Sequence, residues 1–225
     1  MKKSNSPAPA NSANRKNRLP IYIGGIAAVL FIIVTLLVLN GTLDSWNTHV
    51  YKQIASLMSP SLTHVMIFIS FFGQWFIILS AAILLLIMPK TRKSLGIPLT
   101  FTTFSATALG YVLKRIITIP RPAVQDVLVL LEASGYGHPS GHILRTSVFL
   151  GTCAILIWTH TRQKSIKVIA SILAVFLSCL MGFSRIYLGV HTATDTIAAY
   201  LAGIFVLSFS VILWQLTCKF SKKTD

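Results

Sequence analysis

The chain has 225 residues, of which 54% are hydrophobic and 11% are charged. This length suits one domain, and the composition is too apolar for an ordinary soluble one. The formal net charge of +15 would suit a nucleic-acid partner in a soluble protein. In a membrane protein, however, basic residues are judged by their position relative to the spans. We therefore expect a membrane protein with no nucleic-acid partner.

The chain begins with a polar, basic segment that is followed by an apolar run. Residues 1–19 are rich in Ser, Asn, Pro, Lys and Arg and cannot bury enough surface to fold alone, so they predict a disordered tail. Residues 21–39 form an apolar run that is long enough to cross a bilayer and too long for a signal-peptide core. No small-residue cleavage site follows this run. It predicts an uncleaved first span.

The rest of the chain alternates apolar runs with short polar connections. Residues 41–60 are too polar to span, and Ile54, Leu57 and Met58 recur at helical spacing, which predicts a short amphipathic helix on the membrane surface. Five further apolar runs cover residues 64–88, 96–118, 143–158, 166–182 and 194–217. The sequence thus predicts an all-α fold, a bundle of six transmembrane helices with a short interfacial helix between spans 1 and 2. The domain would cover residues 20–218, and a basic tail would cover residues 219–225.

Most basic residues lie on one side of these six spans. Five are in the N-terminal tail and nine are in the loops and tail on the same side, namely Lys2, Lys3, Arg15, Lys16, Arg18, Lys90, Arg92, Lys93, Arg162, Lys164, Lys167, Lys219, Lys222 and Lys223. The positive-inside rule makes this side, with both termini, cytoplasmic. The remaining six are Lys52, Lys114, Arg115, Arg121, Arg145 and Arg185. Five of these six lie at the outer ends of spans 3 to 6, which indicates an anionic ligand there.

The first candidate segment is the end of the third span, from Lys114 to Pro122. Pro120 ends the helix and Pro122 disfavours helical backbone at the residue before it. Arg121 should therefore project from an extended turn just above the helix that carries Lys114. The alternative for Lys114 and Arg115 is that they reach for lipid headgroups, as basic residues at span ends do.

The second candidate segment runs from Gly137 to His142, at the end of the longest connection between spans. Gly141 and the backbone N–H groups of a helix start can face an anion, and Ser140 adds a hydroxyl donor. With the unperturbed histidine pKa of about 6.5, His142 could protonate a leaving oxygen at neutral pH. The alternative for Ser140 is an N-cap. We interpret His138 as a solvated loop histidine.

The third candidate segment runs from Ser184 to Asp195, between the last two spans. If the last span begins near Thr192, His191 and Asp195 lie four residues apart on neighbouring faces. Asp195 could then hold His191 in one tautomer and leave the other nitrogen free to attack. The alternative is a capping pair of Thr192 and Asp195. The planar fork of Arg185 suits phosphate oxygens, and its alternative is a headgroup anchor.

All three segments fall at the same membrane face. Together they supply a cluster of cations, a nucleophile with an orienting carboxylate, and a separate acid, which are the parts that phosphoryl transfer needs. Because Lys114, Arg121 and Arg185 can neutralise a phosphate, we expect no metal and no cofactor.

The spacing of these residues resembles the three-part signature of the type 2 phosphatidic acid phosphatase (PAP2) superfamily, which includes bacterial membrane lipid phosphatases. The motifs are Lys114-x6-Arg121-Pro122, Pro139-Ser140-Gly141-His142 and Ser184-Arg185-x5-His191-x3-Asp195. The resemblance implies that His191 forms a phosphohistidine, that Asp195 orients it and that His142 protonates the leaving group. It also implies a helical core without a required metal and a phosphate-binding set of Lys114, Arg121, Ser140, Gly141 and Arg185.

Two positions depart from what is common in this superfamily. Relatives often carry an aromatic residue at the position of His138, and a small or neutral residue at the position of Arg145. Arg145 would lie about one turn into the fourth span from His142. There it could contact a second phosphate or a lipid headgroup, which would favour diphosphate or phosphoglycerol substrates.

We therefore expect a multi-pass lipid phosphatase of the plasma membrane, with its active site at the extracytoplasmic face. Its substrate would be a lipid phosphate or diphosphate, such as undecaprenyl diphosphate, phosphatidylglycerol phosphate or phosphatidate, and its other partners would be membrane lipids. One alternative is a membrane hydrolase with a Ser140-His191-Asp195 triad, although Gly-x-Ser-x-Gly is absent and the cations would be unused. A second is a noncatalytic binder or transporter of anionic lipids. A vanadate-dependent haloperoxidase, which shares the signature, is disfavoured by the spans.

Overall fold

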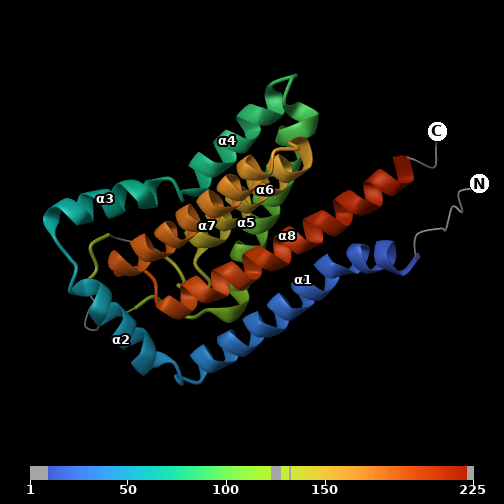
Figure 1. The fold of residues 1–225 in the computed structure, drawn as a ribbon. Helices are drawn as coiled ribbons and strands as arrows, with labels where there is room; N and C mark the ends of the chain where they lie inside the picture. The colour runs from blue at the N-terminus through green and yellow to red at the C-terminus, as the bar shows by residue number, and fades with distance from the viewer. Residues whose placement is uncertain (1–9, 123–127, 132, 222–225) are drawn as a thin grey trace, which may run out of the picture.

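The computed structural model describes residues 10–122, 128–131 and 133–221. All regular elements in these described ranges are helical, which confirms the predicted all-α class. They are α1 (Ala10–Leu39), α2 (Asp44–Ala55), α3 (Pro60–Phe71), α4 (Trp75–Ile87), the π-helical turn η1 (Arg92–Gly96), α5 (Ile97–Ile117), α6 (Gly141–His160), α7 (Lys164–Tyr187) and α8 (Ala193–Ser221) (Figure 1).

Five helical segments of the described chain are long and apolar enough to cross a membrane. They are Arg18–Leu39, Arg92–Ile117, Gly141–His160, Lys164–Tyr187 and Ala193–Trp214. The pair α2 and α3, which is bent by 119°, would add a sixth if it formed one span. The start of α1 and the end of α8 lie at the same end of the bundle, whereas α2 and α3 lie toward the other end (Figure 1).

The predicted second span, residues 64–88, is not one continuous helix. α3 ends at Phe71 and α4 begins at Trp75. The backbone at Gly73 is closely covered, because a Cβ there would lie 2.9 Å from both the Cε of Met181 and the Cδ2 of His142. α4 has 13 residues and is therefore about 20 Å long, shorter than a typical bilayer core of about 30 Å. It carries the chain toward the end at which α8 finishes (Figure 1).

The predicted interfacial helix between spans 1 and 2 corresponds to α2, which packs against α7 and α8. Ile54 and Met58 pack against the buried cluster that contains Tyr187, as the helical spacing predicts. Leu57, which we assigned to the same apolar face, is 56% exposed. Only part of the predicted amphipathic face therefore packs on the bundle.

The first helix begins earlier than the sequence predicts. α1 starts at Ala10, so residues 10–19, which we assigned to a disordered tail, are helical. A helix that is nucleated by an apolar run extends into flanking residues at little cost, because each added residue forms one more hydrogen bond. Residues 1–9 and 222–225 of the predicted tails lie outside the described ranges. The domain boundaries stay predictions.

α6 is the centre of the bundle and packs against α5, α7 and α8. Its residues Ile143, Leu144 and Val148 are fully buried, and α8 presents Ala198 and Ala199, which are also fully buried. Small residues at such a contact let two membrane helices approach closely. The first turn of α6, which carries the second candidate segment, is thereby fixed between the ends of its neighbours.

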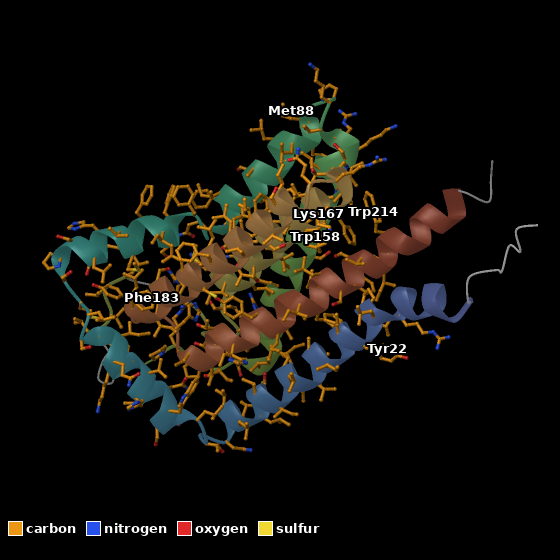
Figure 2. The ribbon with its side chains drawn as sticks, viewed as in Figure 1. Tyr22, Met88, Trp158, Lys167, Phe183 and Trp214 are labelled. Carbon is orange, nitrogen blue, oxygen red and sulfur yellow. The ribbon has the colours of Figure 1, made fainter. Side chains whose placement is uncertain are left out.

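Aromatic and basic side chains lie at the end of the bundle where α6 finishes and α7 begins. The Nζ of Lys167 lies 5.1 Å from the centre of the Trp158 ring. Trp214 of α8 lies at a similar level along the bundle (Figure 2) and lines one apolar cavity together with Thr159 of α6. Trp and Lys side chains are typical of the level where a span meets the headgroups.

Candidate active site

Two adjacent basic residues at the end of α5 take different directions. The Nζ of Lys114 donates to the backbone oxygen of Tyr136, so Lys114 turns toward the long connection. The guanidinium of the exposed Arg115 lies 5.0 Å from the ring centre of Tyr111. The headgroup alternative therefore fits Arg115, and Lys114 belongs to the candidate site.

Arg121 lies just beyond α5 and joins the connection to the turn between α7 and α8. Its Nε donates to the oxygen of Gly135 at 3.2 Å, and its Nη1 donates to the oxygen of Val190 at 2.8 Å. The same Nη1 lies 3.2 Å from the Nε2 of His191. The predicted position of Arg121, above the helix that carries Lys114, thus places it beside the predicted nucleophile.

The turn between α7 and α8 depends on Gly189. Its φ of +71° lies in the left-handed region, and a Cβ there would lie 2.4 Å from the oxygen of Leu128. Any other residue would meet both backbone strain and this clash. The close approach also lets the backbone nitrogen of Leu130 donate to the oxygen of Leu188 at 3.1 Å. The long connection is thereby held against the segment that leads to His191.

His191 and Asp195 form the predicted pair, and both are 2% exposed. The Nδ1 of His191 lies 3.3 Å from the Oδ2 of Asp195. Because a carboxylate only accepts, Nδ1 carries the proton and Nε2 keeps its lone pair. The capping alternative is also present, since the backbone nitrogen of Thr192 donates to the same Oδ2 at 3.0 Å and the nitrogen of Asp195 donates to the Oγ1 of Thr192 at 3.1 Å. One carboxylate therefore caps α8 and orients His191.

Burial lowers the pKa of His191 to about 3, although the hydrogen bond to Asp195 acts in the opposite direction. The imidazole is therefore neutral at neutral pH, which a nitrogen nucleophile requires. Burial also lowers the pKa of Arg121, but a guanidinium stays protonated in proteins. A neutral imidazole thus faces a fixed cation.

The start of α6 places Ser140, Gly141 and His142 beside this pair. Ser140 occupies the N-cap position and is fully buried, but its hydroxyl makes no capping bond. Its Oγ and the Nε2 of His142 are buried atoms without a hydrogen-bond partner among the described residues. Such atoms are costly unless something bonds to them. They indicate donors that are kept for a ligand.

Arg185 and Arg145 contribute two more buried guanidinium groups. Arg185 lies in the last turn of α7, is 1% exposed, and donates through Nη1 to the hydroxyl of Ser70. Arg145 approaches the oxygen of Gly73 with its Nη2, at 3.5 Å. The Nε of each arginine lacks a partner among the described residues. Because buried charges are normally paired, these two arginines indicate an anion.

These groups surround a cavity of about 350 Å³. Seven predicted site residues line it, namely Lys114, Arg121, Gly141, His142, Arg145, Arg185 and His191. Asp195 lies behind His191, and Ser140 lies at the base of α6. The structure thus brings together the predicted catalytic and phosphate-binding residues of all three segments, whereas Arg115 lies over Tyr111. A cavity lined by four basic side chains can bind a phosphate and present it to the Nε2 of His191.

The sequence missed several residues of this site. Gln74 and Trp75 line the cavity, because the break between α3 and α4 lies beside it. Ser70 and Thr35 each make a hydrogen bond to a site residue. A single polar residue within an apolar span is the signal that could have identified the last two.

The interpretation of His138 as a solvated loop histidine is wrong. Its side chain is fully buried, and its Nδ1 lies 3.1 Å from the Oδ1 of Asp195. A residue in a connection is usually exposed, but the last part of this connection folds inward between α1 and α8. His138 is therefore a direct neighbour of the carboxylate of Asp195.

Comparison with known proteins identifies the family. The family model described as the PAP2 superfamily matches residues 95–218. The chain belongs to the PAP2 superfamily. It is 32% identical over 196 residues to the undecaprenyl-diphosphatase of Sulfolobus acidocaldarius, a match that covers 84% of this chain and 90% of that one. It is 27% identical over 187 residues to phosphatidylglycerophosphatase B of Bacillus subtilis, which covers 79% of this chain and 88% of that one.

The fold agrees with this membership. The crystal structure of the transmembrane PAP2 type phosphatidylglycerolphosphate phosphatase from Bacillus subtilis matches 91% of this chain and 98% of that one, with a TM-score of 0.76 and 23% identity. PAP2 membership confirms the resemblance that the motifs predicted, and with it a multi-pass membrane protein of the lipid phosphatase class. The roles of the individual site residues stay predictions.

Proposed function

We propose that this PAP2 protein removes phosphate from a lipid phosphate or diphosphate through a phosphohistidine at His191. The observation that supports this most directly is the Nε2 of His191, which faces a cavity with four basic side chains while its Nδ1 is held by Asp195. In the first step Nε2 attacks phosphorus, the bond to the leaving oxygen breaks, and His142 gives that oxygen a proton. In the second step water attacks the phosphohistidine and releases inorganic phosphate.

The two alternative functions have less support. A Ser140 nucleophile would need a hydrogen bond to His191, but the Oγ of Ser140 has no partner among the described residues. The Nε2 of His191 contacts Arg121 instead. A noncatalytic binder of anionic lipids would use the cations but would have no need for the buried pair of His191 and Asp195.

An apolar groove next to the cavity supports a lipid rather than a soluble phosphate. The groove has a volume of about 430 Å³ and lies between α3, α4, α6 and α7, with Phe68, Leu150 and Met181 in its lining. Gly73 separates it from the cavity, since a Cβ there would contact both Met181 of the groove and His142 of the cavity. A lipid could place its phosphate in the cavity and an apolar chain in the groove.

The membrane orientation is part of the same proposal. The cavity is lined by residues at the end of α5, the start of α6 and the end of α7. These helix ends lie away from the start of α1 and the end of α8 (Figure 1). The positive-inside distribution of the basic residues makes those two ends cytoplasmic. The active site would then open at the extracytoplasmic face of the plasma membrane.

The direct test is phosphate release by the purified protein in detergent, with a chelator present. We expect inorganic phosphate to be released from at least one member of a panel of phosphatidate, phosphatidylglycerol phosphate and undecaprenyl diphosphate. The rate should not change when the chelator is added, because Lys114, Arg121 and Arg185 supply the positive charge. A rate that falls with chelator and returns with a divalent cation would contradict the metal-free mechanism.

Arg145 provides a test of the substrate class. If it contacts a second phosphate, Arg145→Ala should lower kcat/KM on a diphosphate lipid about 10-fold more than on a monophosphate lipid, since a hydrogen bond to a charged group contributes about 1.5–3 kcal/mol. Arg115→Ala is the matched control, because that guanidinium lies over Tyr111. An unchanged ratio of the two rates in Arg145→Ala would exclude this role.

A further inference from the structure

His138 and Thr35 form a chain of hydrogen bonds behind the nucleophile. The Nδ1 of His138 lies 3.1 Å from the Oδ1 of Asp195, and its Nε2 lies 3.0 Å from the Oγ1 of Thr35 near the C-terminal end of α1. His138 is fully buried and Thr35 is 7% exposed. The ring of Phe31, also on α1, lies 6.0 Å from the ring of His138.

The chemistry of these groups fixes the direction of each bond. The carboxylate of Asp195 only accepts hydrogen bonds. The Nδ1 of His138 therefore carries a proton and donates a hydrogen bond to Oδ1. In the tautomer with the proton on Nδ1, Nε2 is an acceptor to which the hydroxyl of Thr35 can donate. Thr35 thus selects the tautomer of His138 that can bond to Asp195, in the same way that a second partner selects the tautomer of a histidine ligand.

Asp195 therefore lies between two imidazoles. Its Oδ1 accepts from His138, while its Oδ2 accepts from His191 and from the backbone nitrogen of Thr192. A rotation of this carboxylate would break the bonds on both oxygens, so its orientation is fixed from both sides. The orientation of Oδ2 in turn sets the direction of the imidazole of His191.

We propose that His138 and Thr35 are positioning residues for the phosphoryl-transfer reaction. They hold Asp195 in the orientation that keeps the Nε2 of His191 directed into the cavity. The inference rests on the proposed function, because it requires His191 to be the nucleophile. It also extends the site to α1, which lies outside the part of the chain that the family model matches.

Three single variants test this role, each purified in detergent and assayed with phosphatidate. His138→Phe keeps an aromatic ring without a donor, and Thr35→Val keeps the shape of threonine without its hydroxyl. We expect His138→Phe to lower kcat about 10-fold or more and to leave KM within about 2-fold, because the buried carboxylate loses one donor. Thr35→Val should lower kcat by a smaller factor, and Thr35→Ser, which keeps the hydroxyl, should restore it.

Thr35 is inferred to act only through His138, which gives a sharper test. The double variant His138→Phe/Thr35→Val should have the same kcat as His138→Phe alone, because residues that act as one unit are not additive. Thr103→Val is the matched control, since Thr103 is fully buried in α5 and lies outside the site. We expect it to keep the kcat of the unaltered protein. Additive losses in the double variant would overturn the inference.

The rate of phosphoenzyme formation separates this inference from the proposed function. With 32P-labelled phosphatidate and quenching in alkaline detergent, in which a phosphohistidine is stable, the unaltered protein should form a phosphoenzyme quickly, and His138→Phe should form it about 10-fold more slowly. Equal rates in both proteins would overturn the positioning role alone. A protein that releases phosphate without any phosphoenzyme would overturn the proposed mechanism as well.

If His138→Phe fails to fold, Thr35→Val and Thr35→Ser decide the matter, since equal kcat values for these two would overturn the inference.

Discussion

His191→Ala is expected to reduce phosphate release about 1,000-fold or more and to abolish the phosphoenzyme. The imidazole would supply the atom that bonds to phosphorus, and loss of a covalent nucleophile is among the largest effects of a single substitution. The Nε2 that it removes lies 3.2 Å from the Nη1 of Arg121 and faces the cavity. The cations remain in the variant, so it should still bind a lipid phosphate. Binding and turnover would thus separate.

The measurement is inorganic phosphate release, together with detection of the phosphoenzyme from 32P-labelled substrate after quenching in alkaline detergent, in which a phosphohistidine is stable. The matched control is His64→Ala, because His64 is an exposed histidine of α3 that bonds to the oxygen of Pro60. The control should retain full activity. A phosphoenzyme that persists in His191→Ala would show that another residue is the nucleophile.

His142→Gln is expected to have the second-largest effect, and one that depends on the leaving group. A positioned general acid contributes about 100-fold to 10,000-fold when the leaving oxygen needs a proton. The Nε2 of His142 is buried without a partner among the described residues. Its side chain lines the cavity, and no carboxylate is among the described residues of that lining. The loss of kcat should therefore be large for phosphatidate and small for p-nitrophenyl phosphate, whose phenolate leaves without a proton.

The two substrates are assayed on the same preparation, so that the ratio of their rates does not depend on the fraction of active protein. His160→Gln is the matched control, because His160 lies at the opposite end of α6 and bonds to the oxygen of Leu156. An equal loss on both substrates would mean that His142 acts through phosphate binding and not as the acid.

Local rules predicted much of the candidate site. The spacing of His191 and Asp195 placed them on neighbouring faces of one helix, and they are 3.3 Å apart through Nδ1 and Oδ2. Proline chemistry around residue 121 predicted that Arg121 leaves the helix and faces the site, and it does. In both cases the deciding residues are within a few positions of one another, so the backbone alone limits where the side chains can lie.

The second span shows where such rules fail. Residues 64–88 form one apolar run, but α3 ends at Phe71 and α4 begins at Trp75, and between them Met181 and His142 approach the backbone of Gly73 closely. A hydropathy window averages composition and contains no information on residues of α6 and α7. For the same reason Gln74 and Trp75 were not expected at the cavity.

The sequence by itself determined the all-α class, the apolar runs that form α1 and α5 to α8, and the three motifs of the PAP2 site. It could do so because the cost of placing polar groups in lipid acts on each segment separately, and because helical spacing is local. Only the tertiary structure decided that Thr35 bonds to His138 and that Ser70 bonds to Arg185, pairs that are 103 and 115 positions apart. Those contacts depend on how α1, α3 and α7 pack around α6 and α8, which no single segment specifies.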